Sequence, residues 1–218
     1  MTASFACVFV RGYVGYTPSY VKNLMSMVKR NYEGDCITYC LTDQSEAVKK
    51  YVDVVIPVKT PSHQYPWWAK IELFRPGRFE GRVTYLDLDV LVTRNLNVIA
   101  DYPSMFALVP HAGSFEGKNG KKVVKRFNSS VMTWTAGQCD DLYENFSLGV
   151  QDRLWGDQDW IGEQKPHARM MPLAWFPRLS EFDAEEGLVP SDARVILCKK
   201  PKNHQAATKW PWFKEAWQ

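Results

Sequence analysis

Short apolar runs alternate with helical patterns along the first hundred residues. Four runs predict strands, at 5–10, 36–41, 52–58 and 82–92. Residues 17–32 repeat apolar side chains at helical spacing, with Thr17 as N-cap and Pro18 at the first helical position. Segments 45–51 and 66–74 predict two more helices. This alternation predicts an α/β fold with a parallel sheet between helices, in which ligands collect at the carboxyl ends of the strands.

The second half of the chain is less regular. It predicts strands at 104–109, 128–134 and 193–198, and helices at 140–146 and 157–164. Residues 111–126 between the first two strands carry three glycines and a cluster of Lys and Arg. This segment is interpreted either as a lid over a bound ligand or as a solvated loop.

Two carboxylates interrupt the most apolar of the predicted strands, "RVTYLDLDVLV". Side chains two apart in a strand point to the same face, so Asp87 and Asp89 are expected to face one spot. Buried like charges need a cation nearby, and hard carboxylate oxygens favour Mg²⁺ or Mn²⁺. The alternative is a structural pair satisfied by Arg or by backbone N–H groups.

Composition excludes several classes of protein. A formal charge of +3 is too weak to indicate nucleic-acid binding. The five cysteines are odd in number and irregularly spaced, which favours buried free thiols in a reducing compartment. There is no signal-peptide pattern and no apolar run of about 18 residues, as a membrane helix would need. We therefore expect a cytoplasmic protein with a single domain over 1–218.

Six segments, in order, resemble motifs of the GT-A-fold glycosyltransferases, in particular glycosyltransferase family 8 and its close relatives. They are "VFVRGYVGY", "WWAKIELF", "YLDLDVLV", "RFNSSVMTW", "GDQDW" and "CKKPKNHQ". The likeness runs from about residue 5 to 205. It implies a GT-A (Rossmann-like), mostly parallel sheet flanked by helices. About 1–100 would form the nucleotide-binding half, and about 101–218 the sugar- and acceptor-binding half.

The resemblance also implies an activity. The chain would be a hexosyltransferase, dependent on Mn²⁺ or Mg²⁺, that moves a sugar from a nucleotide diphosphate sugar, in this family UDP-linked, to a hydroxyl of a carbohydrate or protein acceptor. Family 8 enzymes retain the anomeric configuration, whereas proton abstraction from the acceptor by Asp157 or Asp159 would give inversion. Two alternatives are a non-catalytic nucleotide-sugar or carbohydrate-binding module and a nucleotidyltransferase.

Individual roles follow from the same motifs. The resemblance assigns the donor to Val10, Arg11, Tyr16, Thr42, Asp43, Lys70, Asp87, Leu88, Asp89, Asn128, Ser129 and Lys202. It places Asp157 and Gln158 beside the anomeric carbon. Each assignment has a plainer alternative: Tyr16 packs on the first helix, Asp43 or Asp157 caps a helix, and Lys70 and Gln158 face solvent.

The chain departs from the family pattern at two positions. Ser130 stands where the family has Gly, and Cys198 stands where it has a metal-binding His. Because a thiol suits Mn²⁺ poorly, Cys198 is interpreted as a buried strand-end residue. His204, six residues later, is the predicted third metal ligand beside Asp87 and Asp89. Lys199 and Lys202 are further cations that could face the diphosphate.

The segment "KWPWFKEAW" at 209–217 is open to three interpretations. It could stack on an acceptor sugar, it could touch a membrane surface peripherally through Trp and Lys, or Trp210 and Trp212 could simply pack against the body of the protein.

Overall fold

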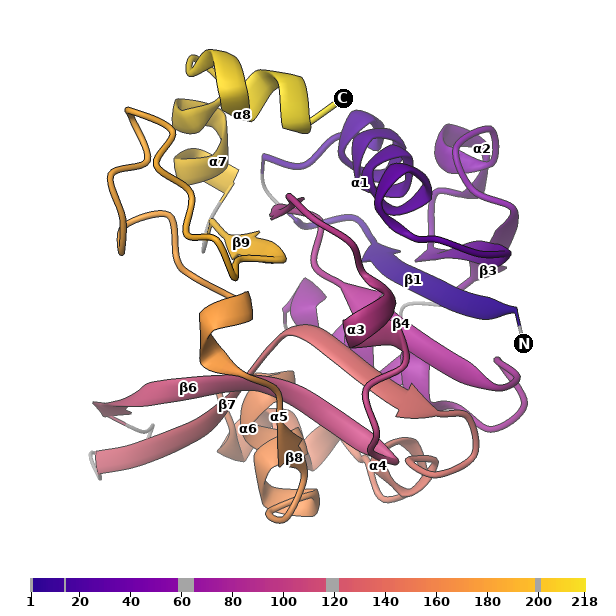
Figure 1. Cartoon of the computed structure of the whole chain (residues 1–218). Helices are drawn as coiled ribbons and strands as arrows, with labels where there is room; N and C mark the ends of the chain where they lie inside the picture. The colour runs from indigo at the N-terminus through magenta and orange to yellow at the C-terminus, as the bar shows by residue number, and fades with distance from the viewer. Residues whose placement is uncertain (1, 14, 59–64, 117–121, 199–200) are drawn as a thin grey trace.

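One sheet of seven strands runs through the computed structural model in the order β3-β2-β1-β4-β7-β6-β8 (Figure 1). The structure describes residues 2–13, 15–58, 65–116, 122–198 and 201–218, with the backbone alone for 112–126 and for Pro201. The strands are β1 (Ala3–Phe9), β2 (Cys36–Thr42), β3 (Val54–Pro57), β4 (Arg82–Leu86), β5 (Val90–Val92), β6 (Phe106–Glu116), β7 (Lys122–Thr135), β8 (Arg169–Met170) and β9 (Val195–Leu197).

Helices connect and cover these strands. They are α1 (Pro18–Asn31), α2 (Ser45–Val48), α3 (Asn97–Ala100), α4 (Asp141–Glu144), α5 (Leu148–Arg153), α6 (Asp157–Gln164), α7 (Pro201–Ala207) and α8 (Pro211–Ala216), with 3₁₀ helices η1 (Pro66–Phe74) and η2 (Leu173–Trp175). In Figure 1, α1 and α2 lie above the sheet and α4 to α6 lie below it. The predicted α/β fold is confirmed.

Strand direction changes in the middle of the sheet. β3, β2, β1 and β4 are parallel, whereas β7 runs antiparallel to both β4 and β6. The carboxyl ends of β1, β2 and β4 therefore share one edge, to which β7 brings residues near the middle of its own length. At this edge loops from the first half of the chain meet a strand from the second half.

Alternate residues of β1 enter two separate cores, and all seven of its residues are buried. Phe5, Cys7 and Phe9 pack with the apolar stripe of α1. Ala6 and Val8 pack with η1 and α6 on the other face. A strand buried on both faces is typical of the centre of an α/β sheet.

The predicted strand 82–92 is wrong in one respect, because the chain breaks it in two. β4 ends at Leu86 and belongs to the large sheet, whereas β5 pairs with β9 in a second sheet of two strands. Asp87 to Asp89 form the turn between them, and Val90 N donates to Asp87 O at 3.4 Å. The carboxylates thus end a strand, where they avoid the apolar faces that β4 and β5 bury.

The interpretation of 111–126 as a solvated loop is wrong for the described backbone, whereas its interpretation as a lid stays a prediction. β6 and β7 continue through it as an antiparallel hairpin, with Gly113 opposite Lys125 and Glu116 opposite Lys122. The side chains of 112–126 and the whole of 117–121 lie outside the described residues.

Two expectations about the cysteines and the C-terminal segment can be compared with the structure. All five cysteines are free thiols, four of them buried and Cys36 half-buried. Trp210, Trp212 and Trp217 pack against the core that includes α1, which is the packing alternative for 209–217. Within the described ranges every helix is too short or too polar to span a lipid bilayer.

Arg82, the first residue of β4, ties the sheet to the segment after α3. Its guanidinium donates to three backbone carbonyls and two threonine hydroxyls, namely those of Ala100, Tyr102, Ser104, Thr133 and Thr135. Lys has three donors and no planar fork, so it cannot make this set.

We predict that Arg82→Lys lowers the free energy of unfolding by about 2 kcal/mol, because at least two acceptors lose their donor. Arg75→Lys, on a side chain that is 54% exposed, is the control and should change stability by less than about 0.5 kcal/mol. Urea unfolding of the two variants measures both values. Equal stabilities would show that the Arg82 contacts are dispensable.

Candidate active site

A pocket of about 160 Å³ opens at the shared carboxyl edge of β1 and β4. Its described lining comprises Val8, Tyr13, Tyr16, Trp67, Lys70, Tyr85, Asp87, Leu88, Asp89 and Ser130. Five of these were predicted from the sequence, namely Tyr16, Lys70, Asp87, Leu88 and Asp89. The pocket therefore gathers side chains from the loop after β1, from η1, from the turn after β4 and from β7.

Asp87 is fixed by three contacts. Its backbone N–H donates to the Ser130 carbonyl at 2.8 Å, which continues the pairing between β4 and β7 by one bond. Its Oδ1 accepts a hydrogen bond from the Tyr85 hydroxyl at 2.5 Å and lies 2.8 Å from Lys70 Nζ. One oxygen of this carboxylate is therefore held by two protein donors.

Asp89 lies deeper than Asp87 and is 7% exposed. Burial, together with the charge of Asp87, raises the pKa of Asp89 to about 6. A hydrogen bond from Tyr16 and the charge of Lys70 oppose this rise but do not cancel it. Among the described residues, positive charge near Asp89 therefore does not offset its burial and the charge of Asp87.

Lys70 joins this pair to a third carboxylate. Its Nζ lies 3.6 Å from Asp157 Oδ2 and 3.4 Å from Ser129 Oγ, and Ser129 donates to the same Asp157 oxygen at 2.7 Å. Burial lowers the pKa of Lys70, but the charges of Asp157 and Asp87 outweigh burial and raise it. Lys70 is therefore a buried ammonium ion, not the solvated side chain of the plainer alternative.

Asp157 opens α6 without capping it. The N-cap is Gly156, and no side-chain cap hydrogen bond is present there. Asp157 is 5% exposed and points to Ser129 and Lys70, so capping does not explain its burial. Gln158 is half-buried and does not line the pocket.

Several other predicted donor residues surround the pocket without lining it. Val10, Arg11, Thr42 and Asp43 follow or end β1 and β2, where Asp43 Oδ1 accepts from the Arg11 backbone N–H at 3.0 Å. Asp43 does not cap α2, whose N-cap is Gln44.

The three remaining predicted donor residues, Asn128, Ser129 and Lys202, also lie outside the lining. Asn128 Oδ1 accepts from Ser130 N at 2.7 Å, so it is bound to its own strand. Lys202 is exposed on α7, and Lys199 lies outside the described residues.

His204, the predicted third metal ligand, does not join the carboxylate pair. It lies on α7, in contact with the rings of Tyr20, Phe213 and Trp217, and is 1% exposed. Its pKa is lowered to about 4 by burial, and neither ring nitrogen has a hydrogen-bond partner among the described residues.

No group of three His, Cys, Asp or Glu side chains suited to a metal ion occurs in the described part of the chain. Cys198 is buried directly after β9, and burial and the charge of Asp89 raise the pKa of its thiol.

Five lining residues were not among the predicted site residues, namely Val8, Tyr13, Trp67, Tyr85 and Ser130, although Tyr85 and Trp67 had a signal. Tyr85 and Asp87 are two apart at the end of a strand and so share a face. Trp67 and Lys70 are three apart in a 3₁₀ helix, where such side chains eclipse. Tyr13 had no such signal, because its position depends on the loop after β1.

Trp67 is fixed beside the carboxylates from three sides. Its Nε1 donates to the Trp155 carbonyl at 2.9 Å, and Tyr65 stacks on it at a centroid distance of 4.5 Å. A Cβ on Gly156 would lie only 3.1 Å from the indole, so this glycine permits the close approach. The indole therefore forms a rigid wall of the pocket.

The two carboxylates of the turn fit a divalent cation. Asp87 Oδ2 has no protein donor among the described contacts, and the raised pKa of Asp89 reports unrelieved negative charge. Oxygen ligands of this kind suit Mg²⁺ or Mn²⁺, which also bind water and substrate oxygens. Asp87 and Asp89 would hold such an ion.

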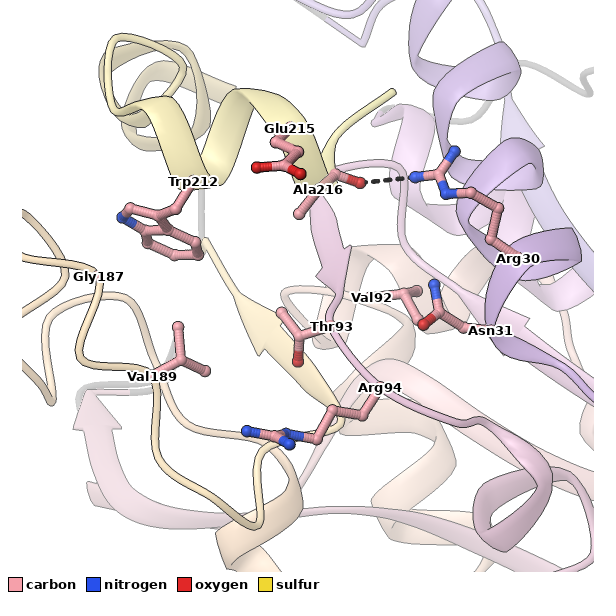
Figure 2. Close-up of a pocket in the computed structure, with 10 residues that line it drawn as sticks. All are labelled: Arg30, Asn31, Val92, Thr93, Arg94, Gly187, Val189, Trp212, Glu215 and Ala216. Atoms are coloured by element: carbon pink, nitrogen blue, oxygen red, sulfur yellow. Dashed lines mark hydrogen bonds between the residues drawn. The ribbon is translucent and has the colours of Figure 1, made fainter.

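A larger pocket of about 380 Å³ lies away from this chemistry, between α1, the end of β5 and α8 (Figure 2). Its side chains mainly hold α8 in place. Arg30 donates to the Ala216 carbonyl at 2.8 Å, as Figure 2 shows, and Trp212 donates to the Ala184 carbonyl at 2.8 Å. Glu215 is the one carboxylate of its described lining. The smaller pocket is therefore the candidate active site.

Comparison with known proteins identifies the fold. No protein-family model matches the chain, and no curated protein sequence is similar to it. Among solved structures, the chain is similar to the apo structure of WbbM, a bifunctional glycosyltransferase, with a TM-score of 0.63 and 11% sequence identity. The match covers 99% of this chain and 51% of WbbM, so the chain spans about half the length of that protein. The chain therefore shares its fold with about half of that protein.

The raised pKa of Asp89 predicts how stability depends on pH in EDTA. The folded state holds the Asp89 proton up to about pH 6 and the unfolded state only to about pH 4, so stability falls as the pH rises between these values. Asp89→Asn should therefore raise the free energy of unfolding by about 2 kcal/mol at pH 7.5 and leave it unchanged at pH 3.5.

Asp53→Asn is the control with the opposite sign. Burial alone would raise the pKa of Asp53, but hydrogen bonds from Thr38 and Lys29 outweigh burial and lower it. Removing the Asp53 carboxylate should therefore destabilise the protein above pH 4. Urea unfolding at the two pH values measures both variants. Loss of stability in Asp89→Asn at pH 7.5 would contradict the charge strain assigned to this pair.

His204→Phe tests the aromatic surroundings of this ring. The lowered pKa means that the wild type loses stability as the pH falls from 6.5 towards 4, by about 3 kcal/mol, and the variant should lose this dependence. If Asp87 and Asp89 hold Mn²⁺, the variant should bind that ion with the affinity of the wild type, because His204 lies among Tyr20, Phe213 and Trp217. A shifted Mn²⁺ curve would instead support His204 as a ligand.

Proposed function

We propose that the chain is a metal-dependent glycosyltransferase that moves a sugar from a nucleotide diphosphate sugar, UDP-linked, to a hydroxyl acceptor. The observation that carries the proposal is the pocket at the carboxyl edge of the sheet, which is lined by Asp87, Asp89 and Lys70. Lys70 links this pocket to Asp157, which lies outside the lining. In open α/β sheets ligands bind at this edge. The glycosyltransferase fold and the resemblance of six ordered motifs support the same assignment.

Each side chain has a role in this proposal. Mn²⁺ or Mg²⁺ held by Asp87 and Asp89 would neutralise charge on the departing diphosphate. Lys70 would donate to diphosphate oxygens, where a buried ammonium forms strong charge-assisted hydrogen bonds. Val10, Arg11, Tyr16, Thr42 and Asp43 surround the space for the nucleoside.

Asp157 and Gln158 belong to the sugar side of the site. Asp157 Oδ2 already accepts from Ser129 and lies near Lys70, which favours orientation of the sugar over direct attack on it. Retention of configuration, with the acceptor entering on the face of the leaving group, is part of the proposal. The acceptor is a carbohydrate or protein hydroxyl bound by the half of the chain after about residue 100.

We predict that UDP raises the stability of the protein only when Mn²⁺ is present. A ligand at about 100 times its Kd adds about 2.7 kcal/mol. Asp89→Asn should stay folded and lose this Mn²⁺-dependent gain, and Asp53→Asn should keep it. Thermal unfolding with Mn²⁺ or with EDTA measures the effect, and an equal gain in EDTA would refute the metal role of the pair.

Product analysis separates the proposal from its two alternatives. A glycosyltransferase incubated with a UDP-sugar and Mn²⁺ releases UDP, with the sugar passing to an acceptor or slowly to water. A nucleotidyltransferase would release pyrophosphate from a nucleoside triphosphate, and a binding module would give the Mn²⁺-dependent stabilisation without any product. Either of these last two results would overturn the proposed activity.

A further inference from the structure

Lys70 is bonded as a counter-ion to the carboxylates of the pocket. Its Nζ contacts three polar groups, from the end of β4, from β7 and from α6, at 2.8 Å from Asp87, 3.4 Å from Ser129 and 3.6 Å from Asp157. It also lies 5.3 Å from the centre of the Tyr85 ring. With 6% of its surface exposed, the ammonium is held by the protein in this position.

The contact with Asp87 has a direct effect on any other cation that uses the same carboxylate. A divalent ion bound by Asp87 and Asp89 would lie within a few ångströms of the Lys70 charge. Positive charges at such a distance repel strongly in a partly buried site. A bare metal ion therefore meets a site in which one carboxylate is already neutralised.

A bound diphosphate turns the Lys70 charge from an obstacle to metal binding into a contribution to it. Its negative oxygens attract both the metal ion and the ammonium, so the group that opposes the metal alone favours the metal–nucleotide complex. Its oxygens also add to the two carboxylates that the described chain offers. Binding of metal and binding of nucleotide are then coupled, and each strengthens the other by the same factor.

We propose that Lys70 is a built-in counter-cation that neutralises Asp87 and Asp157 before the donor arrives and makes tight metal binding conditional on the nucleotide diphosphate. The inference rests on the proposed function. It adds an order of assembly, in which free Mn²⁺ binds weakly and the Mn²⁺–nucleotide complex binds tightly. It also adds a reason for burying an ammonium between two carboxylates beside a metal site.

The test is a titration with Mn²⁺ alone, with UDP alone and with both, in which the electron paramagnetic resonance signal of free Mn²⁺ reports the bound fraction. Lys70→Met should bind Mn²⁺ alone at least ten-fold more tightly than the wild type. UDP without metal, which binds the wild type too weakly to stabilise it, should bind the variant at least ten-fold more weakly still. The factor by which UDP strengthens Mn²⁺ binding should fall accordingly.

Lys29→Met is the matched control. It also removes a lysine from an ion pair, 3.0 Å from Asp53, but this pair is exposed and lies outside the pocket lining. All three affinities should stay at their wild-type values. A similar gain in Mn²⁺ affinity in Lys29→Met would mean that net charge, and not the position of Lys70, controls the metal.

A second variant and a second readout address folding. Lys70→Gln removes the charge and keeps a hydrogen-bond donor for Ser129 and Asp157. In EDTA both Lys70 variants should melt below the wild type, since the carboxylates lose their counter-charge, and Mn²⁺ alone should raise their melting temperatures more than that of the wild type.

Two outcomes distinguish this inference from the function on which it rests. If the wild type binds Mn²⁺–UDP but neither Lys70 variant binds Mn²⁺ alone more tightly, the counter-cation role is refuted and the proposed function stands. If the wild type shows no Mn²⁺-dependent UDP binding, the proposed function fails. The comparison with Mn²⁺ alone still decides whether Lys70 opposes the ion.

Discussion

Burial of like charges at one edge of the sheet is the constraint on which the site depends. Asp87, Asp89 and Asp157 converge there, and Lys70 is the cation that contacts two of them. Isolated carboxylates in such a place would take up protons or distort the fold. The Lys70 ammonium neutralises part of this negative charge. It does not neutralise all of it, because the pKa of Asp89 is still raised to about 6. The remaining negative charge is the feature on which the proposed binding of a divalent cation rests.

The fold produces this arrangement through the change of strand direction at β4. Parallel β1 and β4 end at the same edge, whereas antiparallel β7 passes it in mid-strand, so Ser130 reaches Asp87 and Ser129 reaches Asp157 from the side. The Ser130 carbonyl holds the Asp87 backbone, and the Ser129 hydroxyl holds Asp157 at the start of α6. A fully parallel sheet would place only strand ends here, without a hydroxyl between the carboxylates.

Much of this could be read from the sequence, because the alternation of runs predicts the sheet and the carboxylates that interrupt the apolar run at 82–92 predict that Asp87 and Asp89 face one spot, as their shared pocket shows. The break between β4 and β5 could not, since both halves are apolar and only the pairing of β5 with β9 separates them. The placement of His204 was equally hidden. Its neighbours Tyr20, Phe213 and Trp217 come from distant segments, so spacing along the chain indicates nothing about its surroundings.

Aromatic packing connects the pocket to the C-terminal helices. Tyr16 hydrogen-bonds Asp89, and its ring centroid lies 5.6 Å from that of Tyr13 and 5.1 Å from that of Tyr20. The Tyr20 ring in turn packs on Trp217, at a centroid distance of 5.3 Å. The pocket of about 160 Å³ is smaller than the roughly 300 Å³ at which ligand pockets usually begin. On the proposed function, a nucleotide sugar would therefore have to extend beyond the pocket or displace part of this aromatic wall. Because Tyr16 is held by packing as well as by Asp89, such a displacement would act on the Asp89 carboxylate and on the core at once.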